Sequence, residues 1–267
     1  MKKLFLFLLG LIAFVAQGQP AKRIVSLAPS LTQSLYFLGA QDQLAGCTSY
    51  CEVAKKDKKP IVATAVKLNI EKLLSVKPDL VIVMGLTSTK DIETIRKFGI
   101  EVALFESPKS FEEMCQQFTN LGEIVGKQVQ AYKIVADSKQ KIDKIVASRK
   151  SKPYSKIFFQ IGIDPIFSVL SHTYMDDYIT LLKGENIASR LKHGTVGREF
   201  VIAANPDYIF IAAMGVVGDV EKKTWLKYRS LNASKEKRIF IVDAEIACQP
   251  NPINFVHTME ALVKQMK

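Results

Sequence analysis

The feature that most constrains the fold is an internal repeat. Residues 69–83 and 197–211 share one pattern: a Glu separated by six residues from a Pro-Asp pair, then a run of β-branched and aromatic residues. Proline ends a helix and the apolar run fits a buried strand, so each segment predicts a short helix, a turn and a strand. Equivalent positions lie about 130 residues apart. The chain therefore predicts two similar lobes.

The repeat extends beyond these segments. Residues 22–27 and 156–161 open each half as an apolar strand behind a basic residue, and residues 101–105 and 238–242 follow the Pro-Asp strands. Strands that alternate with helices predict mostly parallel sheets with helices on both faces. The predicted fold class is α/β, with two similar lobes and a mostly parallel central sheet in each.

One long backbone helix is predicted between the lobes at residues 128–150. This stretch lacks Gly and Pro, and its apolar residues fall at close to helical spacing. The predicted organisation is an N-terminal lobe at 19–127, this connecting helix, and a C-terminal lobe at 151–267. Ligands of α/β folds bind outside the carboxyl ends of the strands, so we expect a cleft between the lobes. Its predicted lining is residues 28–30, 48–50, 84–85, 162–167 and 244–252.

The first 18 residues predict a secretory signal peptide. Lys2 and Lys3 precede an apolar run from Leu4 to Ala16, and small residues follow at Ala16 and Gly18. The run is shorter than the roughly 20 residues that a membrane span needs. No Cys lies near the cleavage site, so lipid attachment is not expected there. We expect a soluble protein in a bacterial periplasm.

Charge and motifs argue against several function classes. The net charge is +11, but the lysines are scattered and no recognition motif is present, so we expect a solvated surface and no nucleic-acid partner. The sequence has no Gly-x-Ser-x-Gly, His-Glu-x-x-His or phosphate-binding loop. It also lacks a convergent set of three or four metal ligands. We therefore expect no enzyme, no catalytic cofactor and no free-metal site.

The four cysteines leave alternatives open. They are Cys47, Cys51, Cys115 and Cys248. An exported protein can keep disulfides, and Cys47 and Cys51, with three residues between them, could bridge or begin a metal site. Because cysteine packs as a small hydrophobe, we expect buried free thiols.

The motifs resemble a known family. Residues 23–32, RIVSLAPSLT, followed by Leu38-Gly39, resemble the opening of the iron-siderophore and cobalamin class of periplasmic binding proteins. Residues 71–82 resemble the most typical segment of that class, and residues 159–167 and 184–187 resemble its cobalamin-binding members. The resemblance covers essentially the whole mature chain.

The resemblance implies a solute-binding protein of an ABC importer. Such a protein captures a cobalamin-like corrinoid in the interlobe cleft, closes modestly, and delivers the ligand to the membrane permease. A haem or ferric-siderophore binding protein of the same class is the alternative, and an enzyme on the same scaffold is a third hypothesis. We expect a monomer whose partners are the permease subunits and a small metal chelate.

The resemblance also implies that one surface Glu from each lobe docks on arginines of the permease. The repeat supplies Glu71 and Glu199. A carboxylate near a helix start is stabilised by the helix dipole, and two matched charges suit a symmetric partner. Helix capping alone is the alternative interpretation.

This sequence shares only some of the ligand-cleft residues that the resemblance implies. Tyr50 and Phe167 stand where cobalamin-binding members place aromatic side chains against the ligand, and flat apolar faces suit a macrocycle. Three further aromatic positions and one basic position are replaced, by Ala65, Met84, His193 and Gln249. For an iron chelate, His193 or Tyr50 could ligate the metal directly.

Overall fold

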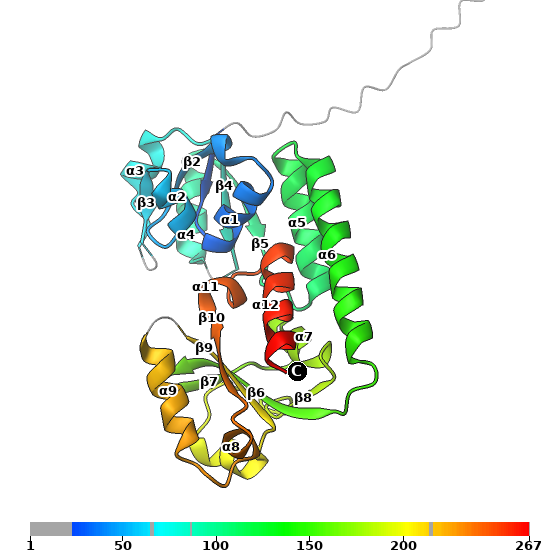
Figure 1. Cartoon of the computed structure of the whole chain (residues 1–267). Coiled ribbons are helices and arrows are strands. Elements are labelled where there is room, and N and C mark those ends of the chain that lie inside the picture. Colours follow the sequence, from blue (N-terminus) through cyan, green and yellow to red (C-terminus); the bar gives the residue numbers. More distant parts are fainter. Residues whose placement is uncertain (1–22, 65–66, 86, 214–215, 267) are drawn as a thin grey trace, which may run out of the picture.

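The computed structural model consists of two α/β lobes, and helix α6 (Gln128–Arg149) runs along one side of both (Figure 1). The structure describes residues 23–64, 67–85, 87–213 and 216–266. The predicted signal peptide lies outside the described residues. Within them, no helix is long and apolar enough to cross a membrane.

The N-terminal lobe is built on a five-stranded parallel sheet in the order β3-β2-β1-β4-β5. Its strands are β1 (Ile24–Ser26), β2 (Leu44–Thr48), β3 (Ile61–Ala63), β4 (Leu80–Met84) and β5 (Glu101–Phe105). Its helices are α1 (Pro29–Phe37), the 3-10 turn η1 (Gln41–Gln43), α2 (Glu52–Lys56), α3 (Ile70–Ser75), α4 (Thr89–Lys97) and α5 (Phe111–Ile124). Successive strand side chains point to opposite faces. Ile82 therefore packs in the core beneath α1 and α5, whereas Val81 and Val83 pack beneath α3 and α4.

The C-terminal lobe has a sheet in the order β10-β9-β6-β7, with β8 also paired to β6. Its strands are β6 (Ser155–Ile163), β7 (Ile166–Ser168), β8 (Gly184–Asn186), β9 (Tyr208–Ala213) and β10 (Ile239–Asp243). Only the β6–β7 pair is antiparallel among the strand pairs of the described residues. Its helices are α7 (Tyr174–Thr180), α8 (Arg198–Ala204), α9 (Val216–Leu226), α10 (Asn232–Lys235), α11 (Ala244–Ala247) and α12 (Pro252–Gln265). The predicted α/β fold with two mostly parallel sheets is confirmed.

The repeat has a structural basis in the two Pro-Asp aspartates. Asp79 Oδ2 accepts a hydrogen bond from the backbone N of Arg23 at 3.0 Å, and Asp207 Oδ2 accepts one from the backbone N of Lys156 at 2.8 Å. In return, the backbone N of Asp79 donates to the carbonyl O of Arg23, and the backbone N of Asp207 donates to the carbonyl O of Lys156. Each lobe thus joins its Pro-Asp turn to its first strand, which places β1-β4-β5 and β6-β9-β10 in equivalent orders.

The two lobes share a hydrophobic core behind the cleft. The observed α6 ends one residue before the predicted helix, and it packs against both α5 and α12. The ring of Phe255 on α12 stacks on Phe111 of α5 at 4.6 Å and on Tyr178 of α7 at 4.5 Å. The aromatic stack therefore joins a helix of the first lobe to two helices of the second.

Polar contacts also cross the lobe boundary. Gln33 Oε1 on α1 accepts hydrogen bonds from Asn251 Nδ2 at 3.0 Å and from Asn254 Nδ2 at 2.7 Å. The backbone N of Phe111 donates to Asp177 Oδ2 at 2.7 Å, and burial raises the pKa of the Asp177 carboxyl. Together with the aromatic stack, these bonds fix the rear of the cleft.

The cysteines are unbridged, and three of them are buried. Cys47, Cys51 and Cys115 lie in the core, as expected for thiols that pack as small hydrophobes. Cys248 is exposed, so the expectation of a buried thiol is wrong there. It follows α11 at the inner edge of the C-terminal lobe, where the chain turns into α12.

Candidate functional site

The candidate site consists of two adjoining cavities between the lobes. Their volumes are about 600 Å³ and about 590 Å³, each within the range of roughly 300–1,000 Å³ that is usual for small-molecule sites. Pro29, Ser30 and Cys248 line both cavities. A ligand in contact with these three residues can extend into both.

The first cavity is lined mainly by the N-terminal lobe. Thr48, Ala63 and Met84, the last residues of β2, β3 and β4, contribute to its wall. Lys67 and Asp91 supply the charged side chains of this wall. The C-terminal lobe contributes Tyr174 from α7 and the residues after α11. Apolar groups, hydroxyls and two opposite charges can hold a large ligand with a polar rim.

The second cavity is lined mainly by the C-terminal lobe. Residues 161–163 at the end of β6, residues 212–213 at the end of β9, and Ala244 after β10 form its wall. The N-terminal lobe adds Pro29, Ser30 and Tyr50. The carboxyl ends of both sheets therefore face the same cleft, which is the expected position for ligands of α/β folds.

The structure places three predicted site residues on the cleft walls. Met84 lines the first cavity, and Tyr50 and Gln249 line the second. The Tyr50 side chain is 58% exposed, so its ring is available for contact with a ligand. Gln249 Nε2 donates to Glu245 Oε2 at 3.1 Å. Ala65 lies outside the described residues.

Phe167 and His193 are not brought to these walls in the described structure. Phe167 lies on the antiparallel strand β7, and an added Cβ at Gly194 would lie only 2.3 Å from its Cε1 atom. The backbone beside His193 therefore packs directly against the Phe167 ring. His193 itself is exposed. Neither residue lines the two cavities.

Tyr174 is a cleft residue that the sequence analysis missed. It is the first residue of α7, and its hydroxyl donates to the carbonyl O of Ala247 at 3.2 Å. Burial raises the pKa of this phenol far above its usual value, so Tyr174 stays neutral in ordinary buffers. Nothing in the sequence around Tyr174 indicates that the start of this helix faces the cleft. Residues 212–213 also line the cleft and are absent from the predicted lining. They could have been predicted, because they end strand β9 and the carboxyl ends of the strands face the cleft.

The two predicted docking residues occupy equivalent positions on the lobes. Glu71 lies in the first turn of α3 and Glu199 in the first turn of α8, and both are exposed. An added Cβ at Gly197 would lie 2.6 Å from Glu199 Oε2, so this carboxylate folds back over the start of its helix. In the described part of the chain neither Glu forms an ion pair.

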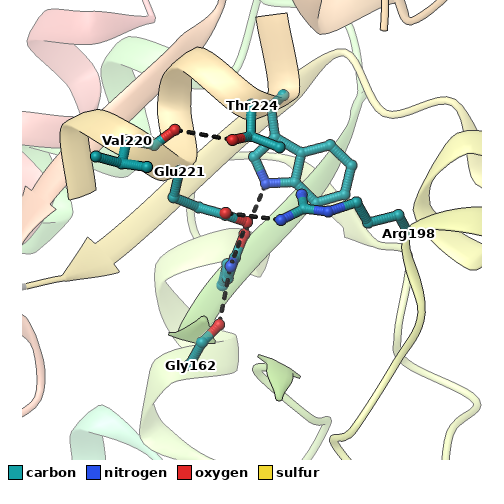
Figure 2. Close-up of polar contacts among 7 residues, drawn as sticks. Gly162, Arg198, Val220, Glu221 and Thr224 are labelled. Atoms are coloured by element: carbon teal, nitrogen blue, oxygen red, sulfur yellow. Dashed lines mark hydrogen bonds and ion pairs between the residues drawn. The ribbon is translucent and has the colours of Figure 1, made fainter. Parts of the chain in front are cut away.

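A buried polar network supports α8 (Figure 2). Arg198 pairs with Glu221 Oε2 of α9 at 2.7 Å, and its guanidinium lies 4.5 Å from the centre of the Trp225 ring. Gln160 Nε2 donates to Glu221 Oε1 and to the Gly162 carbonyl, both at 2.8 Å. Trp225 Nε1 donates to Gln160 Oε1 at 2.8 Å. The network thus joins the helix that carries Glu199 to the cavity-lining end of β6.

The comparisons with known proteins agree with this geometry. A model of the periplasmic binding protein family matches residues 24–246. The chain is 29% identical over 242 residues to the uncharacterized ABC transporter substrate-binding lipoprotein YvrC of Bacillus subtilis (strain 168), covering 86% of this chain and 76% of that protein. It is 26% identical over 223 residues to the vitamin B12-binding protein of Yersinia pestis (strain Pestoides F), covering 82% and 79%.

A solved structure supports the same fold. The periplasmic heme binding protein HutB of Vibrio cholerae superimposes with a TM-score of 0.81 at 21% identity, covering 91% of this chain and 98% of that one. Both the family match and this likeness extend across the two lobes and the cleft between them. The chain therefore belongs to the periplasmic binding protein family.

Proposed function

We propose that the chain is the solute-binding protein of an ABC importer that carries a bulky metal chelate. The observation that carries the proposal is the pair of adjoining cavities, whose walls come from both lobes. A ligand that enters both cavities contacts the carboxyl ends of two sheets at once. The substrate-binding name of the Bacillus subtilis relative supports the transport role.

The first candidate ligand is a cobalamin-like corrinoid. The joined cavities offer room for a macrocycle, and the exposed Tyr50 ring offers a flat contact surface. The name of the Yersinia pestis relative supports this choice. Met84, Gln249 and Ala65 are proposed to adapt the cleft to this chain's own ligand.

The second candidate ligand is haem or a ferric siderophore. Lys67 in the first cavity favours it, because an ammonium group can pair with a carboxylate such as a haem propionate. A heme binding protein shares the fold. Arg190 and Arg198 are the arginines expected to meet siderophore carboxylates, and Arg198 is already paired with Glu221. Tyr50 lines the cleft and is the better placed iron ligand, whereas His193 lines neither cavity.

Calorimetric titration tests the ligand. The chain without its first 18 residues is titrated with cyanocobalamin and, in parallel, with haemin. One saturable site with a dissociation constant below about 1 μM, equivalent to more than roughly 8 kcal/mol, identifies the ligand. Binding of haemin alone selects the second candidate. Absence of binding to cobalamin, haemin and ferric siderophores contradicts the proposal.

Glu71 and Glu199 are proposed to dock on the permease, one from each lobe. Both carboxylates are exposed and stand at equivalent helix starts. Replacing both with Ala is expected to leave ligand affinity unchanged and to abolish uptake into cells that depend on this protein. Glu93→Ala with Glu185→Ala, one exposed carboxylate from each lobe, is the matched control. Normal uptake by the Glu71/Glu199 variant would contradict docking.

The remaining proposals concern location and state. We propose export through the signal peptide at residues 1–18 and a soluble, monomeric protein in the periplasm. The proposed domain organisation is that of the predicted lobes at 19–127 and 151–267, joined by the connecting helix at 128–150. Its proposed partners are the permease and the chelate, with no catalytic role and no nucleic acid.

A further inference from the structure

Two buried cysteines flank the turn that borders both cavities. Cys47 lies in β2 and Cys51 immediately precedes α2. The backbone N of Cys51 donates to the Thr48 carbonyl at 3.1 Å, which closes a tight turn between them. Their side chains are 0% and 1% exposed. The turn carries Thr48 into the first cavity and Tyr50 into the second.

The two thiols share one buried environment. Both belong to the same core cluster, and the Cys51 sulfur lies 3.0 Å from Thr32 Oγ1 and 3.3 Å from Thr48 Oγ1. Thiols that serve only as small hydrophobes need no hydroxyl partners. Cys115 lies instead on α5 and Cys248 beyond α11, on different elements of the fold.

We propose that Cys47 and Cys51 are a redox modification site that forms a reversible disulfide in the wall of the ligand cleft. The bond closes a ring that encloses Thr48, Ser49 and Tyr50. Oxidation therefore restricts the backbone of the turn that presents Tyr50 to the ligand. This inference concerns the chain's own thiols and does not depend on which ligand the cleft binds.

The oxidant is a small or protein disulfide, such as oxidised glutathione, met while the chain folds and the thiols are still accessible. The Cys51 thiolate attacks one sulfur of that disulfide and expels a first thiolate. The Cys47 thiolate then attacks the Cys51 sulfur and expels the second thiolate. Two protein thiols lose two electrons and two protons, and one disulfide becomes two thiols.

Thiol counting after refolding tests the proposal. The full chain is unfolded in guanidinium with dithiothreitol and refolded in a buffer of reduced and oxidised glutathione, with far-UV circular dichroism to verify the fold. Free thiols are alkylated after denaturation, and intact mass and linked peptides are measured. We expect alkylation to fall from all four cysteines to Cys115 and Cys248 alone, with one peptide linked between Cys47 and Cys51. Refolding in dithiothreitol should restore four alkylated thiols.

Matched variants show whether the pairing is specific. Cys115→Ser is expected to keep the Cys47–Cys51 link, and Cys51→Ser is expected to lose every internal link. Four alkylated thiols in the folded, glutathione-treated protein would overturn the proposal. A link from Cys47 or Cys51 to Cys115 or Cys248 would overturn it as well.

Discussion

Removal of the Glu221 carboxylate should destabilise the C-terminal lobe strongly. Glu221 is 3% exposed, and its two oxygens accept from Arg198 and Gln160. Breaking a fully buried ion pair by removing one partner costs about 3–5 kcal/mol. The Arg198 side chain is 22% exposed, and water screens part of its charge. We therefore expect Glu221→Ala to lower the free energy of unfolding by about 2–4 kcal/mol.

A conservative variant separates the charge from the packing. Glu221→Gln keeps the side-chain shape but replaces one acceptor oxygen with an amide that faces Gln160 Nε2, so two donors oppose each other. One unsatisfied buried group costs about 1–3 kcal/mol. Glu236→Ala is the matched control, because Glu236 lies 4.0 Å from Arg238 and 59% of its side chain is exposed. A surface pair of this kind contributes about 0–1 kcal/mol.

Urea unfolding measures these differences. Trp225 is the single tryptophan and donates to Gln160 within the network, so its fluorescence reports the unfolding of this region. The midpoint multiplied by the slope gives each free energy, and far-UV circular dichroism verifies that the slope is unchanged. If the free energies of unfolding of Glu221→Ala and Glu236→Ala differ by less than about 0.5 kcal/mol, the buried network does not stabilise the lobe as argued.

Three further predictions follow from the cleft and the lobe boundary. Tyr50→Ala should weaken binding of the ligand found by titration by about 1–3 kcal/mol, whereas Tyr154→Ala, at an exposed residue before β6 that lines neither cavity, should not; equal affinities would remove Tyr50 from the site. Gln33→Ala should remove the acceptor that the Asn251 and Asn254 amides share across the boundary and leave them only the Gln249 carbonyl, cost about 1–3 kcal/mol and speed amide hydrogen exchange at the start of α12; unchanged exchange would contradict the link. Burial raises the pKa of Asp177, so the folded protein binds that proton more tightly than the unfolded chain, and stability should fall as pH rises from about 3.9 through the raised pKa. Asp177→Asn should lack this fall in a pH series of urea midpoints, and parallel curves for the two proteins would contradict the assignment.

The repeat made most of the fold predictable. A Pro-Asp turn followed by a β-branched run is a local pattern, and the contacts of Asp79 and Asp207 with the first strand of each lobe are its structural counterpart. The sequence pattern does not predict the hairpin of β6 and β7: residues 162–167 are all expected to line the cleft, but only Gly162 and Ile163 line a cavity. A short edge strand beside a proline-containing turn has the same sequence pattern as a loop. Its pairing to β6 places Phe167 at the sheet edge.

The candidate site was predictable only where a strand end forms its wall. Met84 and Ala244 follow from that argument, and both line the cavities. Tyr174 reaches the cleft from a helix, and Gln33 meets Asn251 from 218 positions away in the chain. Contacts of this kind depend on how the elements pack, and a short stretch of sequence carries no sign of them.

The shared core behind the cleft has a consequence for the handover of cargo. Phe255 packs between aromatic rings of both lobes, so a change in the separation of the lobes would disturb this stack, and we expect little lobe movement when the cleft is filled. Binding at one site changes the affinity of a second site only when the protein has conformations that differ in affinity for both ligands. The change is then equal in both directions. Under the proposed function, docking on the permease then barely alters the affinity for the chelate, and empty protein competes with loaded protein for the same permease. Release must draw on work done by the importer, and the ratio of loaded to empty protein sets the rate of uptake.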